Sequence, residues 1–182
     1  MSVASFIGRA DEIERRYCML ANSVCARRAI RQAFRIVSRL GDGVFWYVLI
    51  ASMPLWFGAG RYSEGLRVSA QMLLSGGLGL VLYKFLKKTL VRERPFIGSS
   101  QIECIILPLD RYSFPSGHTL HAVLFTTIVV RAFPQLALVL VPFSILIAAS
   151  RVVLGLHYPS DVLAGALIGW TISRLVELLF FV

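Results

Sequence analysis

Long stretches of the sequence carry no charged side chain, and they constrain the fold more than any other feature. They include residues 43–60, 68–83, 136–150 and 162–173. With its flanks, each approaches the roughly twenty apolar residues that a helix needs to cross a hydrocarbon core of about 30 Å. A soluble core is the alternative, but it does not require uncharged runs of this length. The sequence therefore predicts an integral membrane protein.

We expect an all-α fold, because helices satisfy their own backbone hydrogen bonds inside a bilayer. The chain of 182 residues predicts a single membrane-embedded domain, a multi-pass bundle of about five transmembrane helices. The predicted spans are 43–59, 66–90, 116–133, 135–154 and 161–181. Gly165 and Gly169, one helical turn apart in the last span, are expected to let another helix approach closely.

Residues 1–40 show a different pattern and are predicted to precede the bundle (43–182) as a helical segment at the membrane interface. Apolar residues recur at helical spacing, and arginines occupy much of the remaining surface, which is typical of an interfacial amphipathic helix. The apolar positions include Ile13, Tyr17, Leu20 and Val24. A helical tail in solvent is the alternative.

The net charge of +9 suggests nucleic-acid binding at first sight, but the positions of the charges exclude it. Eight of the 19 basic residues are arginines before Leu40, and most others lie at expected helix ends. Basic side chains at such positions extend towards lipid headgroups. Cys18, Cys25 and Cys104 lack metal-ligand spacing, so no metal and no cofactor is expected.

Three polar motifs interrupt the apolar sequence, and the first contains Lys87, Arg94 and Pro95. The two cations are two helical turns apart and can extend from one face, while the proline ends the helix. Alone this motif is weak, because basic residues are common at the ends of membrane helices. Lys84, Lys88 and Arg92 are interpreted as such residues.

The second motif is Pro115-Ser116-Gly117-His118, at the start of the third predicted span. Serine is a favourable N-cap, glycine lets the backbone approach a ligand, and free N–H groups at a helix start bind anions. A capped helix with an interfacial histidine is the alternative. His121 is assigned to packing or to support of the site.

The third motif contains Arg151, Gly155, His157 and Asp161. Gly155 is expected to end the fourth span, and Ser160 with Asp161 to cap the fifth. His157 and Asp161 are four residues apart across this turn, so the carboxylate can accept a hydrogen bond from one ring nitrogen and leave the other free to attack. Alternatively, Asp161 only caps a helix and Arg151 only flanks a span.

In a five-span topology all three motifs fall on one face of the membrane, which favours a single pocket over three unrelated helix ends. Together they resemble the tripartite signature of the type 2 phosphatidic acid phosphatase (PAP2) superfamily, over residues 87–161. That superfamily includes membrane lipid phosphatases, glucose-6-phosphatase and vanadium-dependent haloperoxidases.

The resemblance implies a role for each residue. His157 is expected to be the nucleophile that forms a phosphohistidine, and Asp161 to orient it. His118 is expected to protonate the leaving oxygen and then to activate water. The implied phosphate-binding residues are Lys87, Arg94, Ser116, Gly117 and Arg151. Three cations can stabilise the phosphoryl oxygens without a metal ion.

The expected function is hydrolysis of a phosphomonoester or pyrophosphate on a lipid of the phosphatidylglycerophosphate, phosphatidate or polyprenyl-phosphate type. A lipid phosphotransferase, a haloperoxidase-like enzyme and a non-catalytic lipid-binding protein are the alternatives. The lipid phosphate and the membrane are the expected partners, and residues 95–114 are a candidate lid.

Many bacterial members have six spans, whereas here the arginine-rich segment replaces the first one. The N-terminus is then expected on the same side as the site. Five arginines lie close before the first predicted span, and the positive-inside rule therefore predicts a cytoplasmic pocket in an inner or plasma membrane. The basic residues counted on the opposite side are Arg61, Arg67 and Arg131.

Overall fold

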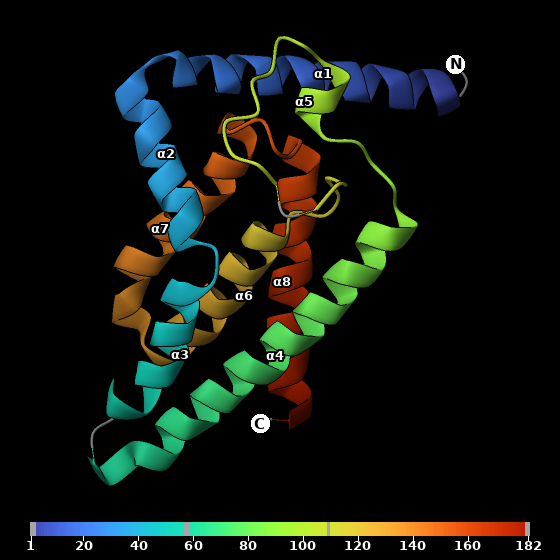
Figure 1. The fold of residues 1–182 in the computed structure, drawn as a ribbon. Helices are drawn as coiled ribbons and strands as arrows, with labels where there is room; N and C mark the ends of the chain where they lie inside the picture. The colour runs from blue at the N-terminus through green and yellow to red at the C-terminus, as the bar shows by residue number, and fades with distance from the viewer. Residues whose placement is uncertain (1–2, 57–58, 109, 181–182) are drawn as a thin grey trace.

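The computed structural model describes residues 3–56, 59–108 and 110–180, and the regular secondary structure in these ranges is entirely helical (Figure 1). This confirms the all-α expectation. The α-helices are α1 (Val3–Ser23), α2 (Arg28–Leu40), α3 (Val44–Trp56), α4 (Tyr62–Thr89), α5 (Pro95–Gly98), α6 (Gly117–Ala132), α7 (Ala137–Val153) and α8 (Pro159–Phe180). Short 3-10 turns at Val24–Ala26, Ala59–Arg61 and Pro134–Leu136 lie between them.

By length and composition, fewer helices in the described ranges qualify as membrane spans than the five predicted. In the described ranges, α4, α8 and the segment Pro134–Val153 are long and apolar enough by length and composition. A fourth span results if α2 and α3, which meet at a bend of 48°, are one broken span. The expected spans at 43–59 and 116–133 are shorter, since α3 has 13 residues and α6 has 16. The membrane class holds, but the count of five does not follow from helix length.

α6 lies at the centre of the bundle, between α8, α4 and α7. Its crossing with α8 depends on the two glycines singled out in the sequence. A Cβ at Gly169 would lie 2.2 Å from the carbonyl oxygen of Leu120, and one at Gly165 would lie 2.5 Å from that of Ser116. The close approach lets the Ser116 N–H donate to the carbonyl oxygen of Asp161 at 3.0 Å. The tight crossing thus places the start of the second motif beside the end of the third.

The segment expected to lie at the interface divides into two helices with different surroundings. α1 lies across one end of the bundle, whereas α2 turns and runs beside α7 (Figure 1). Ser38 of α2 is buried, and its hydroxyl accepts a hydrogen bond from Arg151 of α7, so this part of α2 packs on the bundle. An interfacial position for α1 and for the arginine-rich α2 stays a prediction.

All three motifs lie at the end of the bundle that α1 crosses, and the C-terminal end of α8 lies at the opposite end (Figure 1). The segment after α4 also covers this end, where Ile102 is buried and Leu107 is exposed. Leu109 lies outside the described residues. Whether residues 95–114 act as a lid stays a prediction.

Candidate active site

The turn between α7 and α8 presents the third motif. Gly155 has a φ of +77°, and a Cβ there would lie 2.8 Å from the carbonyl oxygen of Glu103, so this turn requires glycine. α8 begins at Pro159, before both residues that were predicted to cap it, Ser160 and Asp161. Asp161 therefore lies in the first turn, where its Oδ2 accepts the backbone N–H of Tyr158 at 2.9 Å. This is one half of a capping box, in which a first-turn acid reaches back to the N-cap.

His157 and Asp161 are both buried and face each other. The His157 Nδ1 to Asp161 Oδ2 distance is 3.7 Å, so the direct hydrogen bond that we expected is not formed. The other ring nitrogen, Nε2, lies 3.4 Å from Nη1 of Arg94. Because a guanidinium only donates, Nε2 must be the acceptor, and the ring proton is on Nδ1, towards Asp161.

The surroundings of His157 favour a neutral ring. Burial is the main reason that the pKa of His157 falls to about 3; the Asp161 carboxylate opposes this, while Arg151 and Arg94 add to it. At neutral pH the ring therefore carries an unprotonated Nε2. An imidazole in this form has the lone pair that a nucleophile requires.

Two of the three cations of the motifs, Arg94 and Arg151, lie near this ring, and Lys87 lies near both of them. Arg94, which is 2% exposed, donates from Nε to the carbonyl oxygen of Asp110 (3.0 Å) and from Nη1 to that of Leu156 (2.8 Å). Lys87 donates to the carbonyl oxygen of Tyr112 at 2.8 Å and lies 3.1 Å from Asp110 Oδ2. The segment after α4 therefore holds two cations at the site.

Arg151 reaches the same region from α7. Its Nη1 donates to the hydroxyl of Ser38 in α2 at 2.5 Å. Its Nε is buried, and within the described part of the chain this atom has no hydrogen-bond partner. A buried N–H that lacks an acceptor carries a free-energy cost unless a ligand supplies one. The Nε–H group of Arg151 is thus free to donate a hydrogen bond to a bound anion, as expected of a residue in an anion-binding pocket.

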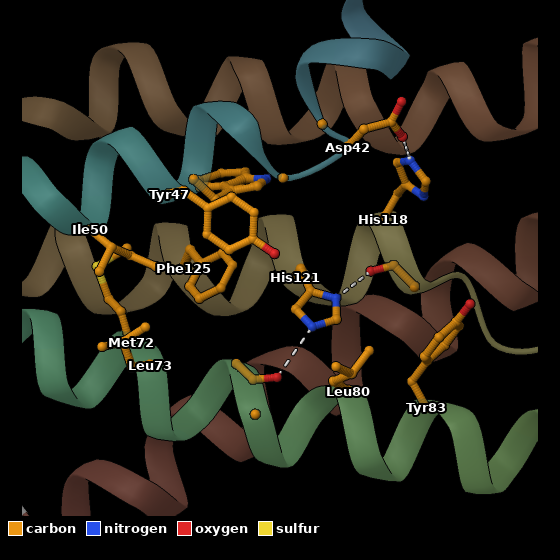
Figure 2. A pocket seen from close by; sticks show the side chains of 16 residues that line it. Asp42, Tyr47, Ile50, Met72, Leu73, Leu80, Tyr83, His118, His121 and Phe125 are labelled. Carbon is orange, nitrogen blue, oxygen red and sulfur yellow. Dashed lines mark hydrogen bonds and ion pairs between the residues drawn. The ribbon is translucent and has the colours of Figure 1, made fainter. Parts of the chain in front are cut away.

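The start of α6 contributes the residues of the second motif to the site. Ser116 is fully buried at the N-cap position, but its hydroxyl pairs with that of Thr119 (2.9 Å) instead of capping the helix. At Gly117 a Cβ would lie 2.8 Å from the ring of Tyr83, so the absence of a side chain lets α4 approach. The Nε2 of His118 is hydrogen-bonded to the carboxylate of Asp42 (Figure 2).

Two residues that sequence reasoning missed belong to the site. Arg92, which we interpreted as an ordinary helix-end cation, donates from Nη1 to Asp161 Oδ1 at 2.7 Å. That interpretation is wrong, and no local pattern reveals a partner 69 positions away. The sequence contained only a weak indication that Asp42 belongs to the site. It is an isolated acidic residue between Gly41 and Gly43, in a short predicted connection between helices.

A groove of about 330 Å³ opens beside His118, between α3, α4 and α6 (Figure 2). Asp42, His118 and His121 lie at one end, and the side chains beyond them are apolar. These apolar side chains include Trp46, Ile50, Met72, Leu73 and Phe125. His121 is hydrogen-bonded through Nδ1 to the carbonyl oxygen of Gly117 at 2.9 Å, so it is a lining residue of this groove.

Comparison with known proteins finds membrane phosphatases among the similar chains. A lipid A 1-phosphatase from Rhizobium etli is 26% identical over 168 residues, which cover 84% of this chain and 72% of that protein. The solved structure of Aquifex aeolicus LpxE superposes with a TM-score of 0.74 at 26% identity, over 88% of this chain and 92% of that one. A transmembrane PAP2-type phosphatidylglycerolphosphate phosphatase from Bacillus subtilis gives 0.70 at 25% identity, over 97% and 86%.

The family model described as the PAP2 superfamily matches residues 68–181, which contain all three motifs and exclude α1, α2 and α3. The match therefore includes every residue that the sequence predicted for the site. This chain belongs to the PAP2 superfamily.

Proposed function

We propose that this membrane protein hydrolyses a phosphate ester or pyrophosphate on a lipid, through a phosphohistidine formed on His157. The main support is the position of the His157 ring. The neutral Nε2 of His157 is buried beside Arg94, while Arg151 and Lys87 reach the same region. The phosphatases from Rhizobium etli and Bacillus subtilis support the same class of reaction.

In the first step, Nε2 of His157 attacks phosphorus in line with the leaving oxygen, forming a P–N bond as the P–O bond breaks. The imidazole becomes positively charged, and Asp161 stabilises that charge from the Nδ1 side. Charge on the equatorial oxygens is stabilised by prearranged donors. These donors are Lys87, Arg94, Arg151, the Ser116 hydroxyl and the Gly117 N–H.

His118 supplies the proton that the departing oxygen needs. A protonated imidazole donates from both ring nitrogens, so Nε2 can bind Asp42 while Nδ1 donates to the leaving group. In the second step the neutral ring accepts a proton from water, and the hydroxide attacks phosphorus. The P–N bond then breaks, inorganic phosphate leaves and His157 is regenerated.

The apolar groove suggests where the rest of the substrate lies. It begins at His118, the residue assigned to the leaving oxygen, and continues between α3 and α4 among apolar side chains. A leaving group that bears a hydrocarbon chain fits this geometry. The substrate class is therefore a lipid phosphate of the phosphatidylglycerophosphate, phosphatidate or polyprenyl-phosphate type.

The pocket is proposed to open towards the cytoplasm of an inner or plasma membrane. Support comes from the arginine-rich helices α1 and α2, which meet at the end of the bundle where the site lies, and from the positive-inside rule. Labelling of a single cysteine introduced at Arg16, which is exposed, with a membrane-impermeant maleimide tests this orientation in intact cells and in inverted vesicles. Cys18, Cys25 and Cys104 are first replaced by serine.

Phosphate release from a panel of purified phospholipids and prenyl phosphates tests the activity. Hydrolysis predicts inorganic phosphate from at least one lipid without any added acceptor. Transfer of phosphate only to a second lipid would instead identify a phosphotransferase. Lack of turnover on every lipid phosphate, in protein that is correctly inserted, would contradict the proposal.

A further inference from the structure

α1 presents one face to the catalytic turn, although it lies outside the region that the family model matches. Glu14 accepts the backbone N–H of Ser160 at 2.7 Å and its hydroxyl at 2.8 Å. Cys18 and Asn22 continue the same face at helical spacing. Asn22 donates to the carbonyl oxygen of Val153 at 3.0 Å, which ties α1 to the end of α7.

Glu14 is also bound to Arg92, at 2.6 Å from Nη2. The other guanidinium nitrogen, Nη1, binds Ser160 and Asp161 Oδ1, each at 2.7 Å. Arg92 therefore bridges the carboxylate on α1 and the buried carboxylate of the site. Asp11 adds a more exposed contact to Arg92 Nη2 at 3.0 Å.

Both carboxylate oxygens of Asp161 are held by hydrogen bonds from neighbouring groups. Oδ1 is held by Arg92, and Oδ2 accepts the Tyr158 N–H while facing Nδ1 of His157. A carboxylate held at both oxygens cannot rotate about its terminal bond. Its orientation towards His157 thus depends on the guanidinium, whose planar fork is itself held by Glu14.

We propose that Glu14 is a positioning residue for this active site: acting through Arg92, it holds the Asp161 carboxylate in line with His157. The inference rests on the proposed nucleophilic role of His157. α1 is then a structural part of the site as well as a candidate interfacial helix. Its opposite face carries Ile13, Tyr17 and Leu20, which are exposed.

Loss of the Glu14 carboxylate is expected to act on the chemical step. The charge that develops on His157 during attack requires a well-oriented Asp161, and small misplacements of such groups cost up to about a hundredfold in rate. Glu14 does not contact Lys87, Arg94 or Arg151, so binding of the phosphate group in the ground state should persist. Loss of the Glu14 carboxylate should therefore lower kcat and leave KM unchanged.

The test compares E14Q, R92M and the double variant, each assayed for kcat and KM on a lipid phosphate in mixed micelles. E14Q is expected to lower kcat by about tenfold or more with KM within about twofold. Because both residues act through one bridge, the double variant should lose no more than R92M does. E12Q is the matched control, since in the described part of the chain Glu12 forms ion pairs with Arg15 and Arg16 of its own helix, and its side chain is 41% exposed.

Wild-type kcat in folded E14Q, a raised KM with unchanged kcat, or multiplicative losses in the double variant would each overturn the inference. Should E14Q fail to fold, as judged by thermal unfolding, R92K replaces it. Lysine keeps the charge but lacks the fork, so it should reproduce the loss of kcat, and full activity would overturn the inference. H157A separates the two proposals: if H157A is inactive and E14Q fully active, only the positioning role fails.

Discussion

Asp42, in the turn between α2 and α3, is hydrogen-bonded to Nε2 of His118, at the start of α6 (Figure 2). The pair joins the region matched by the family model to a helix pair outside it. Asp42 supplies the counter-charge that an imidazolium at this position needs, which suits a group that protonates a leaving oxygen.

Replacement of Asp42 by asparagine keeps the size of the side chain but removes this counter-charge. We expect D42N to lower kcat by about tenfold to a hundredfold on a lipid phosphate, whose alkoxide must be protonated as it leaves. An aryl phosphate such as p-nitrophenyl phosphate has a stable leaving group, so its hydrolysis should fall far less. Equal losses on the two substrates would contradict the assignment of His118 as the acid.

The protonation of His157 is a second testable feature. Burial, assisted by Arg151 and Arg94, lowers the pKa of this ring to about 3 from its usual 6.5. The charged form is disfavoured, so the ring should stay neutral as the pH falls from about 8 to about 5. NMR of the protein with ¹⁵N-labelled histidine measures this, and the signal that disappears in H157Q is the one to follow. A titration midpoint near 6.5 would contradict the buried, cation-flanked site.

The apolar groove beside His118 should hold the hydrocarbon chain of the substrate, and this can be tested at Gly77. At Gly77 a Cβ meets no atom within 4 Å, so a side chain there would extend into open space beside the groove. G77F should therefore lower kcat/KM for a long-chain lipid phosphate by about tenfold or more while folding normally. The same variant should hydrolyse p-nitrophenyl phosphate at close to the wild-type rate. Unchanged activity on the long-chain lipid would show that the chain lies elsewhere.

The crossing of α6 and α8 makes a prediction about stability. A Cβ at Gly169 would lie 2.2 Å from a backbone oxygen of α6, which cannot move without shifting that helix. G169A should destabilise the protein by about 1–3 kcal/mol, as overpacked sites do. Thermal unfolding in detergent measures this, with G60A as the control because a Cβ at Gly60 meets nothing within 4 Å. Equal stability of the two variants would mean that the helices do not approach so closely.

The sequence predicted the membrane class and the helical fold because uncharged runs and motif spacing are local properties. The convergence of Lys87, Arg94, His118 and His157 at one end of the bundle followed from topology. The prediction for Arg92 failed because its partners lie in α1 and α8, and only the way these helices meet brings them together.

The number of spans is harder to predict for a different physical reason. Hydropathy does not report where a helix stops, and α3 covers only Val44–Trp56 and α6 only Gly117–Ala132. Length and composition therefore select three or four spans in the described ranges, where the sequence predicted about five. The packing of α2 on α7 was not predicted, because its contact with Arg151 depends on one small residue, Ser38, in an arginine-rich segment.

In the proposed mechanism phosphate passes through a covalent bond to His157. Base-quenched reaction of the purified protein with a ³²P-labelled lipid phosphate, followed by peptide mapping, tests for this bond, and a parallel sample is treated with acid. We predict a base-stable, acid-labile label on His157 in the wild-type protein and no label in H157Q. A label on another residue, or phosphate release by H157Q at the wild-type rate, would contradict it.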